Sequence, residues 1–182
     1  TLSYRVLNRL QNKLDYYHAD AVTGKESLIL TDKSDTYVDL TYIDDMIYLN
    51  DGKHFITSSE RSGNKHLYLY TNAGKLVRQI TNGPWEAETF VGIDQSKKKK
   101  MLYFLSTEVS PMERHFYQIG LDGKGKKKLS TVAGNTRVNM SNDFKYYINY
   151  HSNALTPSNV SLYKTAGNVK VKVLEDNATL KE

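Results

Sequence analysis

Paired carboxylates, histidines and charged loops are the features of this chain whose residue types could do chemistry. Asp44 and Asp45 are adjacent, and two carboxylates can bind a metal ion or act as an acid–base pair. Neighbouring residues of a strand point to opposite faces, however, so these side chains would not converge on one ligand. The sequence therefore favours a solvated loop at Asp44-Asp45 over a reactive site.

The chain lacks the common motifs of covalent and metal-dependent catalysis. It has no cysteine, no Gly-x-Ser-x-Gly elbow, no His-Glu-x-x-His motif and no glycine-rich phosphate loop. Its histidines are spread out without the spacing of metal ligands; they are His18, His54, His66, His115 and His151. We therefore predict no catalytic group, no metal site and no cofactor within the chain.

The segment Thr107–His115, TEVSPMERH, is the longest break between expected strands. It carries four ionisable side chains, those of Glu108, Glu113, Arg114 and His115. Loops of this kind often carry function. A Glu–Arg pair within the loop that holds its shape is the simpler interpretation, and the sequence favours it.

Positive charge is concentrated in two runs. The net charge is +5, from 25 basic and 20 acidic side chains, and much of the excess lies in Lys97–Lys100 and Lys124–Lys128. A nucleic-acid-binding surface interleaves basic residues with stacking aromatics, which both runs lack. We interpret them as solvated turns that also discourage edge-to-edge sheet pairing, and we predict no nucleic-acid partner.

The elements that must position these residues are strands. Residues 55–81, FITSSERSGNKHLYLYTNAGKLVRQIT, hold two alternating apolar and polar runs, Phe55–Ser59 and Leu67–Tyr70. A turn at Asn72-Ala73-Gly74 follows, and then a third run, Leu76–Ile80. Alternation with a period of two, interrupted by a turn that contains glycine, predicts antiparallel strands joined by hairpins.

This pattern repeats along the chain. The residue pairs that close each hairpin begin 50, 49 and 45 residues apart; they are Leu30-Thr31, Ile80-Thr81, Leu129-Ser130 and Leu174-Glu175. A period near 50 residues with about four short strands per unit predicts the blades of a β-propeller. A β-sandwich would explain the strands but not the recurring spacing.

We therefore predict an all-β fold, a partial β-propeller of about four blades of antiparallel four-stranded sheets with the first blade incomplete. The chain is expected to form one domain, 1–182, with units at about 1–33, 34–82, 83–131 and 132–182. Inner strands are expected at Tyr37–Tyr42, Thr89–Ile93 and Thr136–Met140. Trp85, the only tryptophan, is predicted to fill the gap between neighbouring sheets, with a ligand platform as the alternative.

Several segments, in order and in one register, resemble the N-terminal region of the dipeptidyl peptidase IV family of serine peptidases, and bacterial members in particular. The segments are Ser59–Gly63, His66–Tyr70, Gln79–Thr81 with Gly83 and Trp85-Glu86, Thr107–Pro111, Glu113–His115, and Leu174–Asn177 with Leu180. Leu174–Asn177 is similar to the point where that family leaves its propeller for the catalytic domain.

The resemblance implies an eight-bladed propeller that caps an α/β-hydrolase domain, in an enzyme that releases dipeptides from peptide N-termini. This chain would be the C-terminal half of the propeller. The glutamate pair that grips the substrate amine would lie upstream of Thr1, and the catalytic triad downstream of Glu182. Mammalian members line the substrate cavity with an Arg-Phe-Arg element, and Leu40-Thr41-Tyr42 correspond to it here. Only Tyr42 is therefore expected to line the substrate.

The leading functional hypothesis is a propeller segment that gates access and helps to position peptide N-termini for a catalytic domain outside this chain. The alternative is a stand-alone propeller-type binding or scaffold module. The expected partners are the hydrolase domain of the same parent chain and the peptide substrate, and the parent is expected in the cell envelope, the periplasm or secreted. Self-association is also expected, because the end blades would expose apolar faces and Thr1–Leu7 an unpaired edge.

Overall fold

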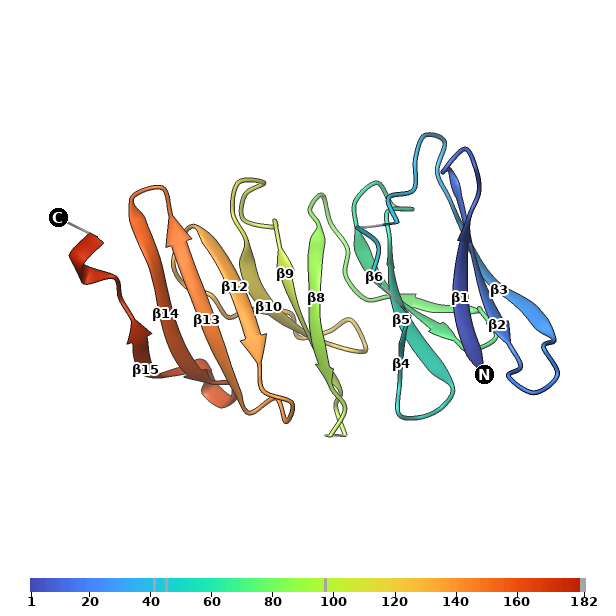
Figure 1. The fold of residues 1–182 in the computed structure, drawn as a ribbon. Helices are drawn as coiled ribbons and strands as arrows, with labels where there is room; N and C mark the ends of the chain where they lie inside the picture. The colour runs from blue at the N-terminus through green and yellow to red at the C-terminus, as the bar shows by residue number, and fades with distance from the viewer. Residues whose placement is uncertain (41, 45, 97, 181–182) are drawn as a thin grey trace. The chain divides into compact units, whose positions relative to one another are not determined.

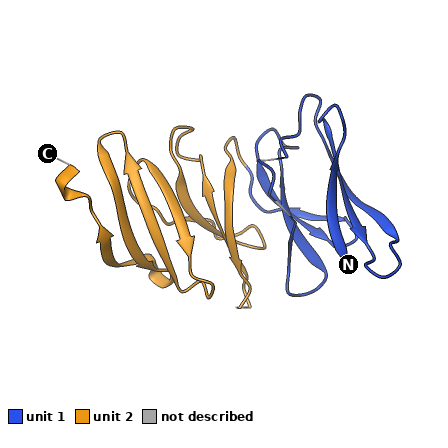
Figure 2. Cartoon of the chain, viewed as in Figure 1, with its two compact units in different colours: residues 1–82 blue, residues 83–182 orange. Residues whose placement is uncertain are grey.

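The computed structural model describes residues 1–40, 42–44, 46–96 and 98–180. Their strands form four antiparallel sheets, and each strand pairs with its neighbour in sequence, so every sheet is a meander (Figure 1). The chain divides into two compact units, residues 1–82 and residues 83–182 (Figure 2). No helix among the described residues is long and apolar enough to span a membrane. The prediction of an all-β fold with four antiparallel sheets is confirmed.

The first unit contains a three-stranded sheet and a four-stranded sheet. The first sheet has the order β1-β2-β3, so it is one strand short, as the sequence predicted. The second sheet has the order β4-β5-β6-β7. The strands are β1 Leu2–Leu7, β2 Lys13–Ala19, β3 Glu26–Lys33, β4 Ile47–Tyr48, β5 His54–Ser59, β6 His66–Thr71 and β7 Leu76–Gln79.

The second unit contains two four-stranded sheets, with the orders β8-β9-β10-β11 and β12-β13-β14-β15. The elements are β8 Ala87–Asp94, β9 Met101–Ser106, β10 His115–Gly120, β11 Lys127–Lys128, β12 Asn135–Met140, β13 Tyr146–Asn153, β14 Thr156–Lys164, the 3-10 helix η1 Ala166–Asn168, β15 Val169–Glu175 and the 3-10 helix η2 Ala178–Leu180. Every residue of β15 is exposed, and valine alternates with lysine from Val169 to Val173.

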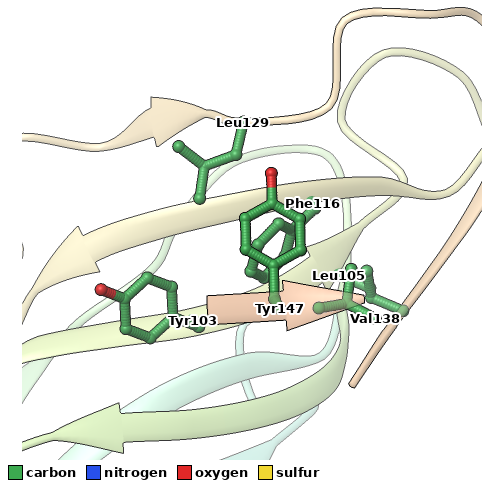
Figure 3. Packing of buried hydrophobic residues seen from close by; sticks show 6 residues of the cluster. All are labelled: Tyr103, Leu105, Phe116, Leu129, Val138 and Tyr147. Carbon is green, nitrogen blue, oxygen red and sulfur yellow. The ribbon is translucent and has the colours of Figure 1, made fainter. Parts of the chain in front are cut away.

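Each unit has its own apolar core between its sheets. In the first unit, Leu14 and Tyr16 of β2 pack with Val38 and Ile43 of the segment that leads to the second sheet. In the second unit, side chains of β9 and β10 pack against side chains of β12 and β13 (Figure 3). The buried members of that cluster are Tyr103, Leu105, Phe116, Leu129, Val138 and Tyr147. The central strands β5, β6, β9 and β10 have no exposed position, so side chains on both of their faces are covered.

The inner strand of the second blade was wrongly predicted at Tyr37–Tyr42. The strand at this edge of the sheet is β4, and it has only two residues. The carbonyl oxygen of Asp39 accepts hydrogen bonds from the N–H groups of Tyr42 at 3.2 Å and Ile43 at 3.1 Å, which makes a turn. The N–H of Val38 donates to Gln11 in the first sheet's loop. The sequence of this segment alternates, but its backbone forms a turn and a bond to the first sheet's loop instead of a ladder with β5. Thr41 lies outside the described residues.

The lysine-rich run Lys124–Lys128 was predicted as a turn, and only its first part is one. Lys127 and Lys128 form β11 and pair with Gln118 and Tyr117 of β10. Both lysines are exposed, so the outer edge of this sheet carries charge where a further strand would otherwise pair. In the other lysine run, Lys97 lies outside the described residues.

Gly74 lies where the backbones of the two sheets of the first unit approach closely. Its φ of +80° suits glycine, and a Cβ atom there would overlap the carbonyl oxygen of Ile29 in β3. Gly24, in the hairpin of the first sheet, has a similar φ of +71°, but a Cβ atom there would meet nothing within 4 Å. The two glycines share a backbone conformation and differ in their surroundings.

Replacing each glycine by alanine separates these two effects. Gly24→Ala should lower the free energy of unfolding by about 1–2 kcal/mol, the cost of a left-handed backbone with a Cβ atom. Gly74→Ala should cost clearly more, because the backbone of β3 must also shift. Urea unfolding of both variants measures the difference; equal losses would show that the close approach to Ile29 has no energetic weight.

Candidate functional site

Tyr42, the residue expected to line the substrate, lies in the irregular segment before β4 and is held by a buried lysine. Lys65 is 2% exposed. Its ammonium donates a hydrogen bond of 2.5 Å to the carbonyl oxygen of Tyr42 and lies 4.3 Å from the centre of the Tyr42 ring. The same ammonium lies 3.2 Å from a carboxylate oxygen of Asp44. We call Lys65, Tyr42 and Asp44 the lysine clamp.

The segment that carries the clamp is also bonded to β5. The N–H of Asp44 donates to the hydroxyl of Ser58 at 2.7 Å, and the hydroxyl of Thr57 donates to the carbonyl oxygen of Asp44 at 3.0 Å. Asp44 lies in a loop, as predicted, but its carboxylate is only partly solvated, because it faces the buried Lys65. Asp45 lies outside the described residues.

A polar cavity of about 400 Å³ lies beside this segment in the first unit. The guanidinium of Arg61 forms an ion pair with Asp32 at 3.4 Å and lies 5.2 Å from the ring centre of Tyr68 and 5.6 Å from that of Tyr70. Burial raises the pKa of Tyr70 to about 12, so the phenol stays neutral at physiological pH. The cavity is lined by Asp32, Lys33, Ser34, Asp35, Thr36, Tyr37, Val38, Ile43, Glu60, Arg61 and Gly63.

The loop Thr107–His115 is held in place, but not by the Glu–Arg pair that the sequence favoured. Arg114 pairs with Glu88 of β8. Because Ala87 pairs with Ser106 at the end of β9, Glu88 lies beside the loop and meets Arg114. Lys126 pairs with Glu108 at 2.5 Å. The prediction was wrong about the partners, since it considered only charges inside the loop.

His115 is 1% exposed and connects Glu113 to a hydroxyl group. One ring nitrogen lies 2.7 Å from the Glu113 carboxylate, and the other lies 2.9 Å from the hydroxyl of Ser130. The hydrogen bond from His115 lowers the pKa of Glu113. A carboxylate, an imidazole and a hydroxyl in this order have the composition of a nucleophilic triad.

The same imidazole–hydroxyl pair occurs in the second sheet, which argues for a structural role. There, Nδ1 of His66 lies 3.1 Å from the hydroxyl of Thr81. In both sheets the hydroxyl also accepts a hydrogen bond from the backbone N–H of the residue that follows the histidine, Leu67 at 3.0 Å and Phe116 at 3.0 Å. The two pairs are 49 residues apart, as the repeat requires. We call them the histidine–hydroxyl pairs and interpret them as blade closures.

Trp85 and the histidines complete the set of residues that the sequence singled out. The Trp85 ring stacks on Phe104 with a centre distance of 6.2 Å, and the Lys126 ammonium lies 4.5 Å from its centre. These contacts lie within one sheet and its loops, so the prediction that Trp85 fills a gap between sheets stays a prediction. No group of three histidine, aspartate or glutamate side chains among the described residues could hold a metal ion.

Comparisons with known proteins agree with one another. Residues 1–158 match the family model described as the dipeptidyl peptidase IV N-terminal region. A protein of Aspergillus flavus described as a probable dipeptidyl peptidase 4 is 28% identical over 189 residues, which cover 100% of this chain and 24% of that protein. Dipeptidyl peptidase 4 of Trichophyton rubrum is 28% identical over 191 residues, again 100% of this chain and 24% of the relative.

Among solved structures, dipeptidyl peptidase 4 of Porphyromonas gingivalis is similar over 98% of this chain and 25% of its own, with a TM-score of 0.89 and 36% identity. A Bacteroides ovatus structure is similar in fold, with a TM-score of 0.78, 19% identity and coverage of 96% and 27%. The chain thus spans about a quarter of the length of these relatives. The prediction of a partial β-propeller is confirmed, whereas the bacterial origin stays a prediction.

The histidine–hydroxyl pair of the second sheet can be tested at Thr81. Thr81→Val keeps the shape but removes the hydroxyl, and it should cost about 1–3 kcal/mol because a buried imidazole nitrogen and the N–H of Leu67 lose their partner. Thr81→Ser, the residue type found at position 130, keeps the hydroxyl and should cost less. Chemical denaturation gives both values; equal costs would contradict a role for the hydroxyl.

The lysine clamp can be tested by Lys65→Met, which keeps the length of the side chain and removes the charge. Tyr42 and Asp44 lose their shared partner, so the amides of this segment should exchange hydrogen about tenfold faster, which corresponds to about 1.4 kcal/mol. Lys75→Met, at an exposed position of the next hairpin, is the matched control. Unchanged exchange in Lys65→Met would show that the clamp does not order the segment.

Proposed function

Because this chain belongs to the dipeptidyl peptidase IV N-terminal region family, we propose that it is the propeller segment that gates a serine-type dipeptidyl peptidase and helps to position peptide N-termini. The single observation that carries the proposal is the match of the family model to most of the chain. The catalytic α/β-hydrolase domain of the same parent chain is the proposed partner, and a peptide is the proposed substrate.

The gating role is supported by the rigidity of the sheets. Each unit has an apolar core, and the blade closures are buried hydrogen bonds, so the strands of each blade should move little relative to one another. A ring of such blades over an active site admits a thin peptide end and excludes a folded protein by size. The proposal therefore assigns to the chain a selection by shape rather than a step of bond cleavage.

The positioning role is proposed for Tyr42. Its ring is held on one side by the ammonium of Lys65, which lies 4.3 Å from the ring centre, and its backbone is held by the same group. A side chain fixed in this way loses little entropy when a peptide binds to it, so it contributes more to positioning than a mobile one.

An activity assay of the intact parent protein tests the proposed function as a whole. The parent should cleave a chromogenic Xaa-Pro substrate and short peptides, and it should leave folded proteins of the same N-terminal sequence uncleaved. If the intact parent cleaves no Xaa-Pro substrate, the proposal fails and the stand-alone binding or scaffold module takes its place. The cell-envelope location and the self-association of this segment stay predictions.

Tyr42→Ala in the intact parent tests the positioning role separately. The KM for a peptide substrate should rise about tenfold, with kcat changed less than about twofold, because the lost contact serves binding rather than chemistry. Tyr42→Phe keeps the ring beside Lys65, so its KM should lie between that of the unchanged parent and that of Tyr42→Ala. Tyr146→Ala, at a tyrosine that is 42% exposed in β13, is the control. An unchanged KM in Tyr42→Ala would remove Tyr42 from the substrate site.

A further inference from the structure

The second unit contains a cavity of about 240 Å³ between the connection that follows β11 and the fourth sheet. At about 30 Å³ per water molecule, this is room for about eight waters or one small organic molecule. The cavity uses none of the residues assigned to peptide positioning. Its lining residues include Leu129, Ser130 and Val132 from the connection, Thr136 of β12, Asn149 and His151 of β13, Asn159 and Tyr163 of β14 and Lys170 of β15.

Two lining residues of this cavity each carry a buried polar atom that has no partner among the described residues. These atoms are the hydroxyl oxygen of Thr136 and Nε2 of His151. Thr136 is 3% exposed, and it pairs with His151 across β12 and β13. Because nearly all buried polar groups in proteins are hydrogen-bonded, two orphaned neighbours in one cavity indicate a site for a hydrogen-bonding guest. Burial lowers the pKa of His151, so its ring is neutral at pH 7.

The strand register divides the cavity into a polar end and a charged end. Thr136, His151 and Asn159 lie in one row across three strands. Tyr147, Tyr163 and Lys170 lie in a second row. The rows are four residues apart along β13, which corresponds to about 13 Å between backbone positions.

The second row supplies an aromatic wall and a cation. Tyr147 and Tyr163 stack with a centre distance of 5.0 Å, and the Lys170 ammonium lies 5.7 Å from the Tyr163 ring centre. Leu129 packs against Tyr147 in the same cluster, and Figure 3 shows the Tyr147 hydroxyl pointing to the side on which Leu129 lies. None of the described lining residues is acidic. A cation without a nearby carboxylate in the lining favours an anionic guest.

From these features we propose that the cavity binds a small organic carboxylate with an apolar middle and a hydroxyl group at its far end. The carboxylate meets Lys170, the apolar part lies along Leu129, Tyr147 and Tyr163, and the hydroxyl reaches Thr136 and His151. This inference does not rest on the proposed peptidase function, because it concerns another unit and another class of ligand.

The test measures binding of para-hydroxyphenylpropionate to the intact parent protein by isothermal titration calorimetry, beside two relatives of the probe. Phenylpropionate lacks the hydroxyl, and para-hydroxyphenylpropionamide lacks the charge. The parent should bind the hydroxylated carboxylate about three- to tenfold more tightly than either relative, the range expected for one hydrogen bond or one exposed charge contact.

Two variants assign each preference to its residue. Thr136→Val should abolish the preference for the hydroxyl and keep the preference for the charge. It should not destabilise the protein, since it replaces an unpartnered buried hydroxyl by a methyl group of the same shape. Lys170→Met should abolish the preference for the charge and keep that for the hydroxyl. Lys172→Met, at an exposed lysine of the same strand that is not a lining residue, should leave both preferences intact.

The proposal is overturned if para-hydroxyphenylpropionate does not bind, in which case the cavity holds water only. It is also overturned if binding occurs but both preferences survive in Thr136→Val and Lys170→Met, because the probe would then occupy another site. Peptidase activity of the parent is measured in parallel. Full activity together with no binding would reject this inference alone and leave the proposed function standing.

Discussion

A buried imidazole must have partners for its nitrogens, and this requirement organises the second and third sheets. In each of these sheets the first residue of the third strand is a histidine, His66 or His115, whose Nδ1 meets the hydroxyl of a residue that follows the fourth strand. That hydroxyl also accepts a backbone N–H, so one atom ties two strands together. The fourth strand of the third sheet, β11, has only two residues. The buried bond therefore closes the blade where the ladder is too short to do so.

In the first unit, ion pairs hold segments of the chain in place, as hydrogen bonds do in the blade closures. Arg61 and Lys65 both lie in the connection between β5 and β6, and each pairs with a carboxylate, that of Asp32 or that of Asp44. Burying a lysine is costly unless its ammonium is paired and hydrogen-bonded, and the carbonyl oxygen and ring of Tyr42 complete its surroundings. The irregular segment before β4 therefore has a defined place on the sheet although it contains no long strand.

Local pattern was sufficient for most of the fold and insufficient for the site. Phe55–Ser59 and Leu102–Ser106 alternate, and they form β5 and β9 nearly to the residue. Tyr37–Tyr42 alternates as well, but the hydrogen bonds of Asp39 and the first sheet's loop take its backbone into a turn. Tyr42 itself came from family resemblance, whereas its contact with Lys65, 23 residues away, leaves no periodic signal. Partners distant in sequence are chosen by tertiary packing, which a single sequence does not display.

The meander order of the sheets has a consequence for synthesis. Every strand pairs with its neighbour in sequence, so each sheet can form as soon as its own stretch of chain has left the ribosome, without waiting for later residues. The last strand of each sheet pairs on one side only, so its other edge is open to strands of other chains. In β15 the lysines that alternate with valines from Val169 to Val173 repel a second copy of the same edge, and they thereby guard the growing polypeptide against aggregation.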